Sequence, residues 1–496
     1  MQKKQTILVV ASLLVVVLSV TLAYFTAQII GKGKIVTINS ADLKIIFTDS
    51  DGSISGTNIE PGKWNVTKTF TIENKSNETY KYNIVIQDLV NTFVTNGYLQ
   101  YKITSTNGGY NMTEFKDVPK SETATDTILA YSVSIPVGVT QSYTVEFIYK
   151  NDESIDQSED MGRKLSGTLF ITEGTEDPNK TLYNQLLVDK STKLTRTDFS
   201  KVLTDNNTNT LYTGVEDSKT VYYFAGNATD NWVKFGKNAS NQDLYWRIIR
   251  TNSDGSVRLL YHGTSTTATD AYIVTSAFNS SYDNIAYVSY MYGSLGSISS
   301  ARENTNNSTI KTTIDNWYIS NLEAKGYTKY LSTTAVYCND RSISSDSINF
   351  GAFTRLGTNK TPSYDCAATE DKFTVDTSTG NGKLTYPIAL MTADEVSFAG
   401  GLYGANTPTW YYYNSVNGSS TGSKFWWLLS PLDSSTSGSS MFIVRGSSNP
   451  GRLNYNYVNS NNGVRPALSL KSCVKYSSGD GSAENPYTIK ETETGC

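Results

Sequence analysis

The strongest constraint on the fold is a series of short runs, within residues 34–172, in which apolar and polar residues alternate. Gly, Asn, Asp, Ser and Pro separate the runs, as they do at turns between β-strands. The runs are Ile35–Ile38, Leu43–Phe47, Val66–Ile72, Tyr82–Ile86, Leu99–Ile103, Ser142–Tyr149 and Leu165–Ile171. This many short strands within about 140 residues predict an all-β, antiparallel sandwich, to which we assign residues 31–175.

A long apolar run precedes the sandwich region. Ile7–Phe25 carries no charged residue and follows Lys3 and Lys4. As a helix it would cross the hydrocarbon core of a membrane, and the two lysines would stay on the cytoplasmic side. Secretory signals have a shorter apolar core, but small residues near the end of the run leave cleavage open. We therefore expect residues 1–30 to form a hydrophobic helix, either a membrane anchor or a signal, and the remaining chain to be extracellular.

The four cysteines agree with an oxidising compartment. Cys338 and Cys366 form one local pair and Cys473 and Cys496 another, with no C-x-x-C motif. Four cysteines allow three connectivities, of which sequential pairing is the simplest. The second pair would clip a tail at residues 473–496.

The charge balance and the scarcity of histidine exclude several functions. With 42 basic and 46 acidic residues, the net charge is −4. This weighs against a nucleic-acid partner, which requires a basic face. His262 is the one histidine of the chain, so there is little material for acid–base catalysis or for a zinc site. We expect no enzyme activity, no metal and no cofactor.

The carboxyl-terminal part mixes strands with helices. After a polar break we expect a linker at residues 176–211 and a second domain at 212–472. Ser253–Gly255 predicts a hairpin turn. Apolar residues recur at helical spacing in Ser308–Lys325, and Thr392–Glu395 forms a capping box that begins a shorter helix. The mixture predicts an α+β domain.

An ordered series of motifs runs through this second region. They are Tyr222–Asn227, Val233–Gly236, Tyr245–Arg250, Asp254–Tyr261, Cys338–Ser342, Gly380–Pro387, Thr392–Val396, Trp427–Pro431 and Gly463–Pro466. Together they resemble an uncharacterised family of bacterial surface proteins that shares the C-type-lectin-like fold of formylglycine-generating enzymes and of variable proteins diversified by retroelements. The resemblance covers about residues 215–472. Separately, Leu22–Thr26 and the sandwich that follows are similar to camelysin-type secreted matrix and fibre proteins.

The resemblance implies a ligand-binding face near the carboxyl end, between a Trp-rich strand and the Gly-x-Arg-Pro strand. Here that window is Phe425–Pro466. It is rich in Asn, Ser, Tyr, Gly, Asp and Arg, which adenine-directed mutation of Asn codons would yield and which also suit adaptable binding surfaces. The candidate ligand-binding residues are Asp433, Ser435, Arg445, Ser447, Asn449, Arg452, Asn454, Asn456 and Asn459, with Tyr412 at the border. The alternative is an ordinary polar loop region.

Three function classes follow from these observations. The leading interpretation is an adhesin-like cell-surface or secreted protein that binds an unidentified protein or glycan on another cell or surface. The alternative is a structural subunit of a fibre, assembled through the sandwich. A glycan-active enzyme using Asp394 and Glu395 is a third class, although adjacent carboxylates need not face each other. Formylglycine-generating chemistry is not expected, since no cysteine lies between Phe425 and Pro466.

Overall fold

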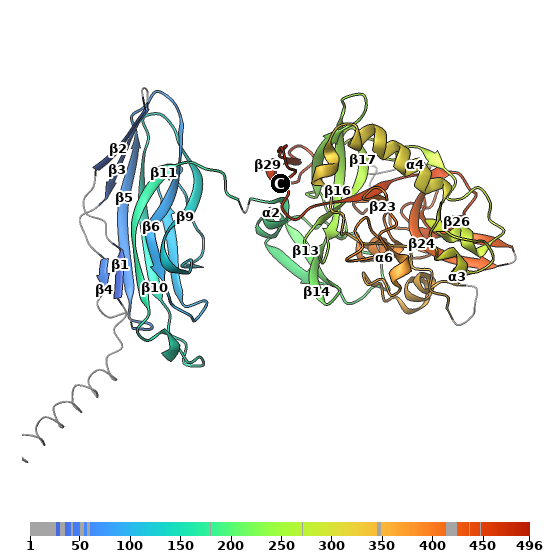
Figure 1. Cartoon of the computed structure of the whole chain (residues 1–496), viewed down its shortest axis with the longest axis horizontal. Helices are drawn as coiled ribbons and strands as arrows, with labels where there is room; N and C mark the ends of the chain where they lie inside the picture. Colours follow the sequence, from blue (N-terminus) through green and yellow to red (C-terminus); the bar gives the residue numbers. More distant parts are fainter. Residues whose placement is uncertain are drawn as a thin grey trace, which may run out of the picture. The chain divides into compact units, whose positions relative to one another are not determined.

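The computed structural model describes residues 26–29, 35–40, 43–49, 54–56, 60–178, 180–269, 271–344, 349–412, 424–435, 437–446 and 448–496. The chain divides into two compact units, Met1–Pro178 (unit 1) and Asn179–Cys496 (unit 2), and strands dominate both (Figure 1). The expected membrane-spanning segment, Ile7–Phe25, lies outside the described residues. Within the described ranges, no helix is long and apolar enough to cross a membrane.

Unit 1 consists of two β-sheets. Their strand orders are β4-β1-β11-β6-β9 and β2-β3-β5-β10-β7-β8. The strands are β1 (Thr26–Ile29), β2 (Ile35–Ser40), β3 (Leu43–Asp49), β4 (Ile54–Gly56), β5 (Asn65–Asn74), β6 (Tyr80–Asn91), β7 (Leu99–Ser105), β8 (Lys116–Asp117), β9 (Ser121–Ile135), β10 (Thr140–Tyr149) and β11 (Lys164–Glu173). The pairs are antiparallel except that of β1 with β11.

The core of unit 1 follows directly from the alternating sequence. In β10, Tyr143, Val145 and Phe147 are buried, whereas the residues between them are partly exposed. Leu169 and Ile171 of β11, in the other sheet, belong to the same buried cluster. Successive side chains of a strand point to opposite faces, so each sheet contributes one apolar face to a shared core. The β-rich fold thus agrees with the sandwich prediction, although β1 extends the sheet into the expected leader at residues 1–30.

Unit 2 combines two larger sheets with short helices. A curled ten-stranded sheet follows the path β12-β13-β14-β16-β15-β30-β29. Three further strands branch from this path: β17 pairs with β16, β28 with β17, and β23 with β28. A five-stranded sheet has the order β18-β27-β24-β25-β26. The strands are β12 (Thr192–Thr195), β13 (Thr210–Glu216), β14 (Lys219–Tyr223), β15 (Trp232–Lys237), β16 (Asp243–Thr251), β17 (Val257–Gly263), β18 (Thr275–Ser276), β19 (Met291–Tyr292), β20 (Asn306–Asn307), β21 (Tyr337–Cys338), β22 (Lys372–Phe373), β23 (Ile388–Leu390), β24 (Trp426–Ser435), β25 (Gly438–Val444), β26 (Leu453–Tyr457), β27 (Asn462–Gly463), β28 (Pro466–Leu470), β29 (Tyr476–Ser478) and β30 (Tyr487–Ile489). The α-helices are α2 (Leu182–Asp189), α3 (Ile298–Ala301), α4 (Thr309–Tyr318), α5 (Gly351–Phe353) and α6 (Ala393–Phe398).

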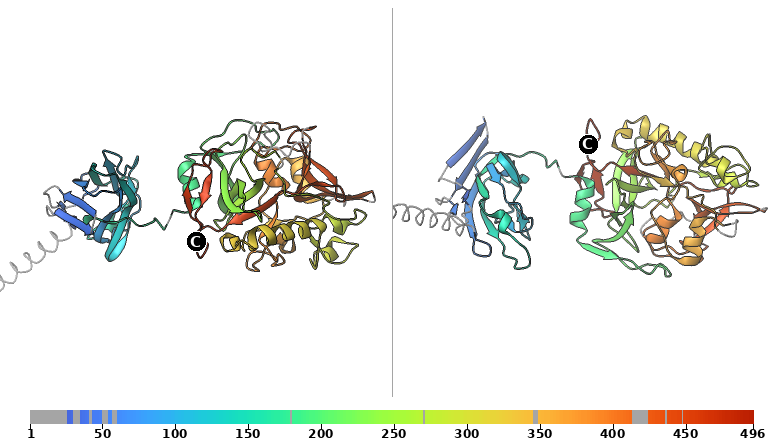
Figure 2. Two further views of the ribbon diagram at one scale, coloured as in Figure 1. Left: turned by 90° about the horizontal axis from the view of Figure 1, so that it is seen from above. Right: turned by 60° about the horizontal axis from the view of Figure 1, so that its bottom comes forward.

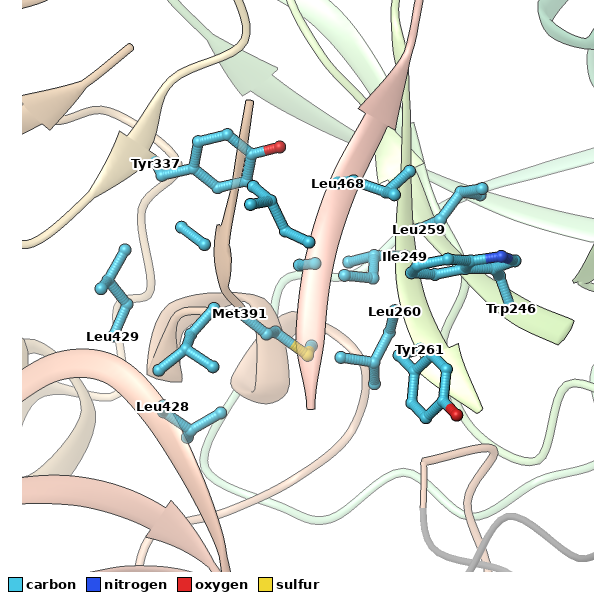
Figure 3. Packing of buried hydrophobic residues seen from close by; sticks show 14 of the residues in the cluster. Trp246, Ile249, Leu259, Leu260, Tyr261, Tyr337, Met391, Leu428, Leu429 and Leu468 are labelled. Carbon is cyan, nitrogen blue, oxygen red and sulfur yellow. The ribbon is translucent and has the colours of Figure 1, made fainter. Parts of the chain in front are cut away.

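Segments far apart in sequence build the core of unit 2. β28 lies between β17 and β23, and Leu468 pairs with Leu259 and with Ile388. Figure 3 shows side chains from these elements and from β24 meeting in one apolar cluster, including Leu468, Met391 and Leu428. All three side chains are fully buried. The part of β24 that carries Leu428 is therefore packed into this core, and the five-stranded sheet extends from it.

The two expected helices and the expected hairpin are present. Ser308 caps α4 by accepting a hydrogen bond from the backbone N–H of Lys311, and the helix buries its apolar side. At α6, Thr392 and Glu395 form both bonds of the capping box. β16 and β17 pair in antiparallel fashion around Ser253–Gly255. Local sequence signals therefore placed these three elements correctly.

The expected linker and tail belong to the folded body of unit 2. Within residues 176–211, Leu182 and Leu186 of α2 are buried in the core, and β12 pairs with β13. Within residues 473–496, β30 pairs with β15, and the ring of Tyr487 is buried. The two segments supply the strands at opposite ends of the ten-stranded path, β12 at one and β30 and β29 at the other, which the local sequence pattern did not indicate.

The cysteines are joined in the sequential pairing. Cys338 bonds to Cys366 and Cys473 to Cys496, with Cα–Cα distances of 5.7 and 5.2 Å. The first disulfide joins β21 to a distant loop, and the second attaches the final residues to the segment after β28. Two disulfides fit an oxidising, extracellular environment.

Candidate functional site

The face expected between Phe425 and Pro466 lies on the five-stranded sheet, in which β26 forms an edge. Figure 2 shows these strands at the end of unit 2 away from the carboxyl terminus. Asp433, Ser440 and Tyr457 are paired in turn across β24, β25 and β26. Directly paired residues of antiparallel strands place their side chains on the same face. A carboxylate, a hydroxyl and a phenol ring therefore stand in one row.

Tyr457 of this row lies in a group of four tyrosines, and we call Tyr282, Tyr403, Tyr455 and Tyr457 the tyrosine patch. Tyr282 and Tyr455 are 41% exposed and Tyr457 is 44% exposed, whereas Tyr403 is half-buried. The rings of Tyr282 and Tyr457 lie 5.8 Å apart. A Cβ on Gly438 would lie 2.4 Å from Cδ2 of Tyr282 and 3.1 Å from Cε1 of Tyr457. Glycine at this position therefore lets both rings rest against β25.

Electrostatic effects connect the patch with two of the candidate residues. Burial raises the pKa of the Tyr403 hydroxyl, as do the nearby Tyr455 and Asp433, while Arg445 acts in the opposite direction. Burial also raises the pKa of the Asp433 carboxyl, and a hydrogen bond from the Ser440 hydroxyl opposes that rise. No cation of the described residues contributes to the Asp433 shift. Its carboxylate is therefore a half-buried acceptor beside aromatic rings.

The two candidate asparagines of β26 form hydrogen bonds at the edge of the sheet. Since the Val458 N–H bonds to β25 and bonding alternates along a strand, the N–H groups of Tyr455 and Tyr457 point away from the sheet. Oδ1 of Asn454 accepts the first of these at 2.8 Å, and Oδ1 of Asn456 accepts the second at 3.0 Å. Both asparagines therefore satisfy the open edge of β26 and protect it against strand pairing.

The other candidates lie around the same sheet. Ser435 and Asn459 are exposed, and Arg445, Asn449 and Arg452 are half-buried. The Nε of Arg452 donates to Oδ1 of Asn406 at 2.9 Å. The guanidinium of Arg445 lies 5.2 Å from the centre of the Phe425 ring. Ser447 lies outside the described residues. These side chains form a polar border to the tyrosine patch.

The expectation that Tyr412 borders the binding face is wrong. Its side chain is fully buried, with the ring 4.8 Å from that of Trp410 and 6.5 Å from that of Trp426. Consecutive aromatics alone did not show which of them faces the interior. Tyr412 contributes to the core beneath the sheet and cannot contact a ligand at the surface.

Sequence reasoning missed the exposed tyrosines as site residues. Tyr455 and Tyr457 alternate with the chosen asparagines, and the period of two in Asn454–Tyr457 was the available signal. It shows that the two residue types occupy opposite faces, but it does not show which face is open. Tyr282 comes from a distant loop, and no local signal relates it to β26.

The carboxylates considered for catalysis are engaged in a buried ion network. Asp394 forms two bonds with Arg355, at 2.9 and 3.0 Å. Oε1 of Glu395 accepts from Arg250 Nε at 2.9 Å and from Arg258 Nη1 at 2.7 Å. Burial would raise the pKa of Glu395, but Arg258 and Arg250 hold it at about 2. This arrangement is a structural network rather than an acid–base pair.

A hollow of about 600 Å³ opens beside α3. Two arginines line it, Arg302 and Arg341, and both bind the buried Asp371, at 2.7 and 2.8 Å. The exposed Glu303 and Glu370 complete much of its wall. The hollow thus offers hydrogen-bonding groups but no aromatic surface, in contrast to the tyrosine patch.

Two further findings concern metal binding and similarity to known proteins. No group of three or more His, Cys, Asp or Glu side chains in the described part of the chain is placed to hold a metal ion. Neither the models of known protein families nor the curated proteins compared with the chain gave a match. Fold and site together describe a two-unit, β-rich protein with a tyrosine-lined sheet face.

Proposed function

We propose that the protein is an extracellular ligand-binding protein of the adhesin type, which holds its ligand on the tyrosine patch. The observation that carries the proposal is the exposure of Tyr282, Tyr455 and Tyr457 beside the half-buried carboxylate of Asp433. The protein acts by binding rather than by catalysis, and it requires no metal or cofactor.

The chemistry of the patch supports this proposal. Tyrosine rings provide rigid contact area at low entropic cost, and their hydroxyls remain able to form hydrogen bonds. Asp433 adds a half-buried acceptor on the same face, and the buried Ser440 hydroxyl donates to it. Such a surface suits the apolar face and the hydroxyls of a sugar, and equally a polar protein loop. The partner is accordingly a protein or a glycan on another cell or surface, and not a nucleic acid.

The proposed location is the surface of a bacterial cell, with the protein anchored through residues 1–30 or released after cleavage. The uncharged run Ile7–Phe25 behind Lys3 and Lys4 supports it. The resemblance of residues 215–472 to C-type-lectin-like surface proteins supports the distal binding role. By analogy with the variable proteins in that resemblance, we propose that the amino acids in the window Phe425–Pro466 are hypervariable.

Binding to glycan and protein arrays tests the proposal. The double variant Tyr455→Ala, Tyr457→Ala should weaken binding at least tenfold, because truncation of a central aromatic typically costs about 2 kcal/mol. The control is Leu194→Ala, since Leu194 is 43% exposed on the ten-stranded sheet. Unchanged binding by the tyrosine variant, with its melting temperature retained, would refute the site.

A structural role in a fibre is the second candidate, and one observation favours it. β9 is a 15-residue strand at the edge of its described sheet, where it pairs with β6 alone. An open edge of that length is a template for pairing with another chain. Electron microscopy separates the candidates: regular filaments that disappear on deletion of residues 34–172 would favour assembly, and their absence would leave ligand binding.

A further inference from the structure

Two buried arginines of unit 2 form no ion pair with a carboxylate of the described residues. Arg247 is 1% exposed and Arg465 is 0% exposed. Arg247 donates to the side chain of Asn231 and to the carbonyl oxygen of Ala228, both at 2.7 Å. Arg465 donates to the carbonyl oxygen of Tyr261 at 3.1 Å. These acceptors are all neutral, so they satisfy hydrogen bonds without forming an ion pair. Of the described carboxylates, Asp230 attracts Arg247 electrostatically, but its ion pair is with Lys190.

Both guanidinium groups belong to one cluster, which we call the arginine cluster and which contains Arg247, Arg465, Tyr411, Tyr412 and Trp426. Arg247 lies 5.4 Å from the centre of the Tyr411 ring, and Arg465 donates to the carbonyl oxygen of Tyr412 at 3.3 Å. The rings of these consecutive tyrosines are 3.9 Å apart. Arg465 also lies 4.7 Å from the ring of Trp426. Two like charges are therefore held close together in the interior.

Hydrogen-bond donors in this cluster also lack acceptors. Arg247 Nη1 and Trp426 Nε1 are buried and have no hydrogen-bond partner among the described residues, and the same holds for the neighbouring Trp410 Nε1. Burial lowers the pKa of Arg247 and of Arg465 to about 9, although Tyr411 and Tyr412 act in the opposite direction on both; the charge of Arg465 is a smaller cause of the lowered pKa of Arg247.

We propose that the arginine cluster binds one small inorganic anion of the halide class, with Arg247 Nη1 as a donor to it. An anion is the partner that suits two buried guanidinium groups without an ion pair among the described residues and the unsatisfied N–H groups beside them. The cluster is enclosed, since none of its five side chains is more than 1% exposed. An enclosed site admits a monatomic ion more readily than an organic acid. The anion stabilises unit 2 and is separate from the ligand held by the tyrosine patch.

Thermal unfolding of the full chain tests the site directly. The midpoint is measured in sodium bromide, in sodium chloride and in sodium gluconate at one constant ionic strength. A bound halide should raise the melting temperature by about 2 °C or more for each tenfold increase above its dissociation constant. In crystals grown with bromide, an anomalous peak should lie within hydrogen-bonding distance of Arg247 Nη1. A melting temperature that does not depend on halide, together with no such peak, would overturn the proposal.

Two matched variants separate anion binding from general core damage. Arg247→Met should abolish the halide dependence. Arg341→Met removes an equally buried arginine whose charge is matched by Asp371. That control should lower the melting temperature but retain the halide dependence. Halide dependence that persists in Arg247→Met contradicts the assignment, and if this variant does not fold, the bromide measurements on the unaltered chain decide.

Discussion

Replacement of Glu395 by Gln removes the charge that neutralises two buried arginines. Arg250, Arg258 and Glu395 are at most 3% exposed at their side chains. Burial alone would raise the pKa of Glu395, but Arg258 and Arg250 lower it from 4.5 to about 2. A fall of this size corresponds to about 3 kcal/mol of stability at pH 7. We expect Glu395→Gln to lower the free energy of unfolding of unit 2 by about that amount, as for other broken buried ion pairs.

The pH dependence of this loss has a defined sign. Because the pKa of Glu395 is lower in the folded chain than in the unfolded chain, the stabilisation is complete above about pH 4.5 and disappears as the pH falls toward 2. At pH 3 the carboxylate contributes about 1 kcal/mol. The difference in stability between the unaltered chain and Glu395→Gln should therefore shrink by about 2 kcal/mol between pH 7 and pH 3.

Guanidinium unfolding followed by tryptophan fluorescence measures this difference. Of the seven tryptophans of the chain, Trp64 is the one in unit 1, so the signal reports mainly on unit 2. Glu303→Gln, at an exposed position, is the control and should change stability by less than about 0.5 kcal/mol. A loss below about 1 kcal/mol at pH 7 for Glu395→Gln, or an equal loss at both pH values, would refute the reasoning.

Three further predictions follow from the fold. Joint replacement of Cys338 and Cys366 by Ser opens a loop of 28 residues and should cost about 3.6 kcal/mol in chemical denaturation; an unchanged midpoint would contradict this. Leu186→Ala should cost about 3 kcal/mol, because this helix belongs to the core, whereas a linker residue would cost nothing. Gly438 has a φ of +139° and lies beneath two tyrosine rings, so Gly438→Ala should lower the free energy of unfolding by about 1–3 kcal/mol and weaken ligand binding. If calorimetry shows unchanged stability and a binding assay shows unchanged affinity, the position of the rings does not depend on this glycine.

Local patterns in the sequence were sufficient for many elements. The alternation in Ser142–Tyr149 predicts a strand with one buried face, and the structure buries Tyr143, Val145 and Phe147. The capping box at Thr392–Glu395 predicts the start of α6. In each case the residues that form the interaction are neighbours along the chain, so no knowledge of distant segments is needed.

Local sequence patterns could not identify which strands pair with each other. β30 pairs with β15 across about half of the chain, and α2 packs into the core although its sequence resembles a linker. The same limit explains why the sequence pointed to Tyr412, which is buried, and not to Tyr455, which is exposed. Whether an aromatic ring is covered depends on which distant segment packs against it, and the sequence near the ring does not contain that information.

The sequence by itself determined the β-rich character of the chain and the two local cysteine pairs as the simplest of three connectivities, and the family resemblance gave the window in which a binding face is expected. These features depend on residue type and on short spacings. The tertiary structure alone decided that tyrosines form that face and that Arg247 and Arg465 meet in the interior. The physical reason is that burial and charge compensation are properties of the packed chain, in which residues more than 200 positions apart share one environment.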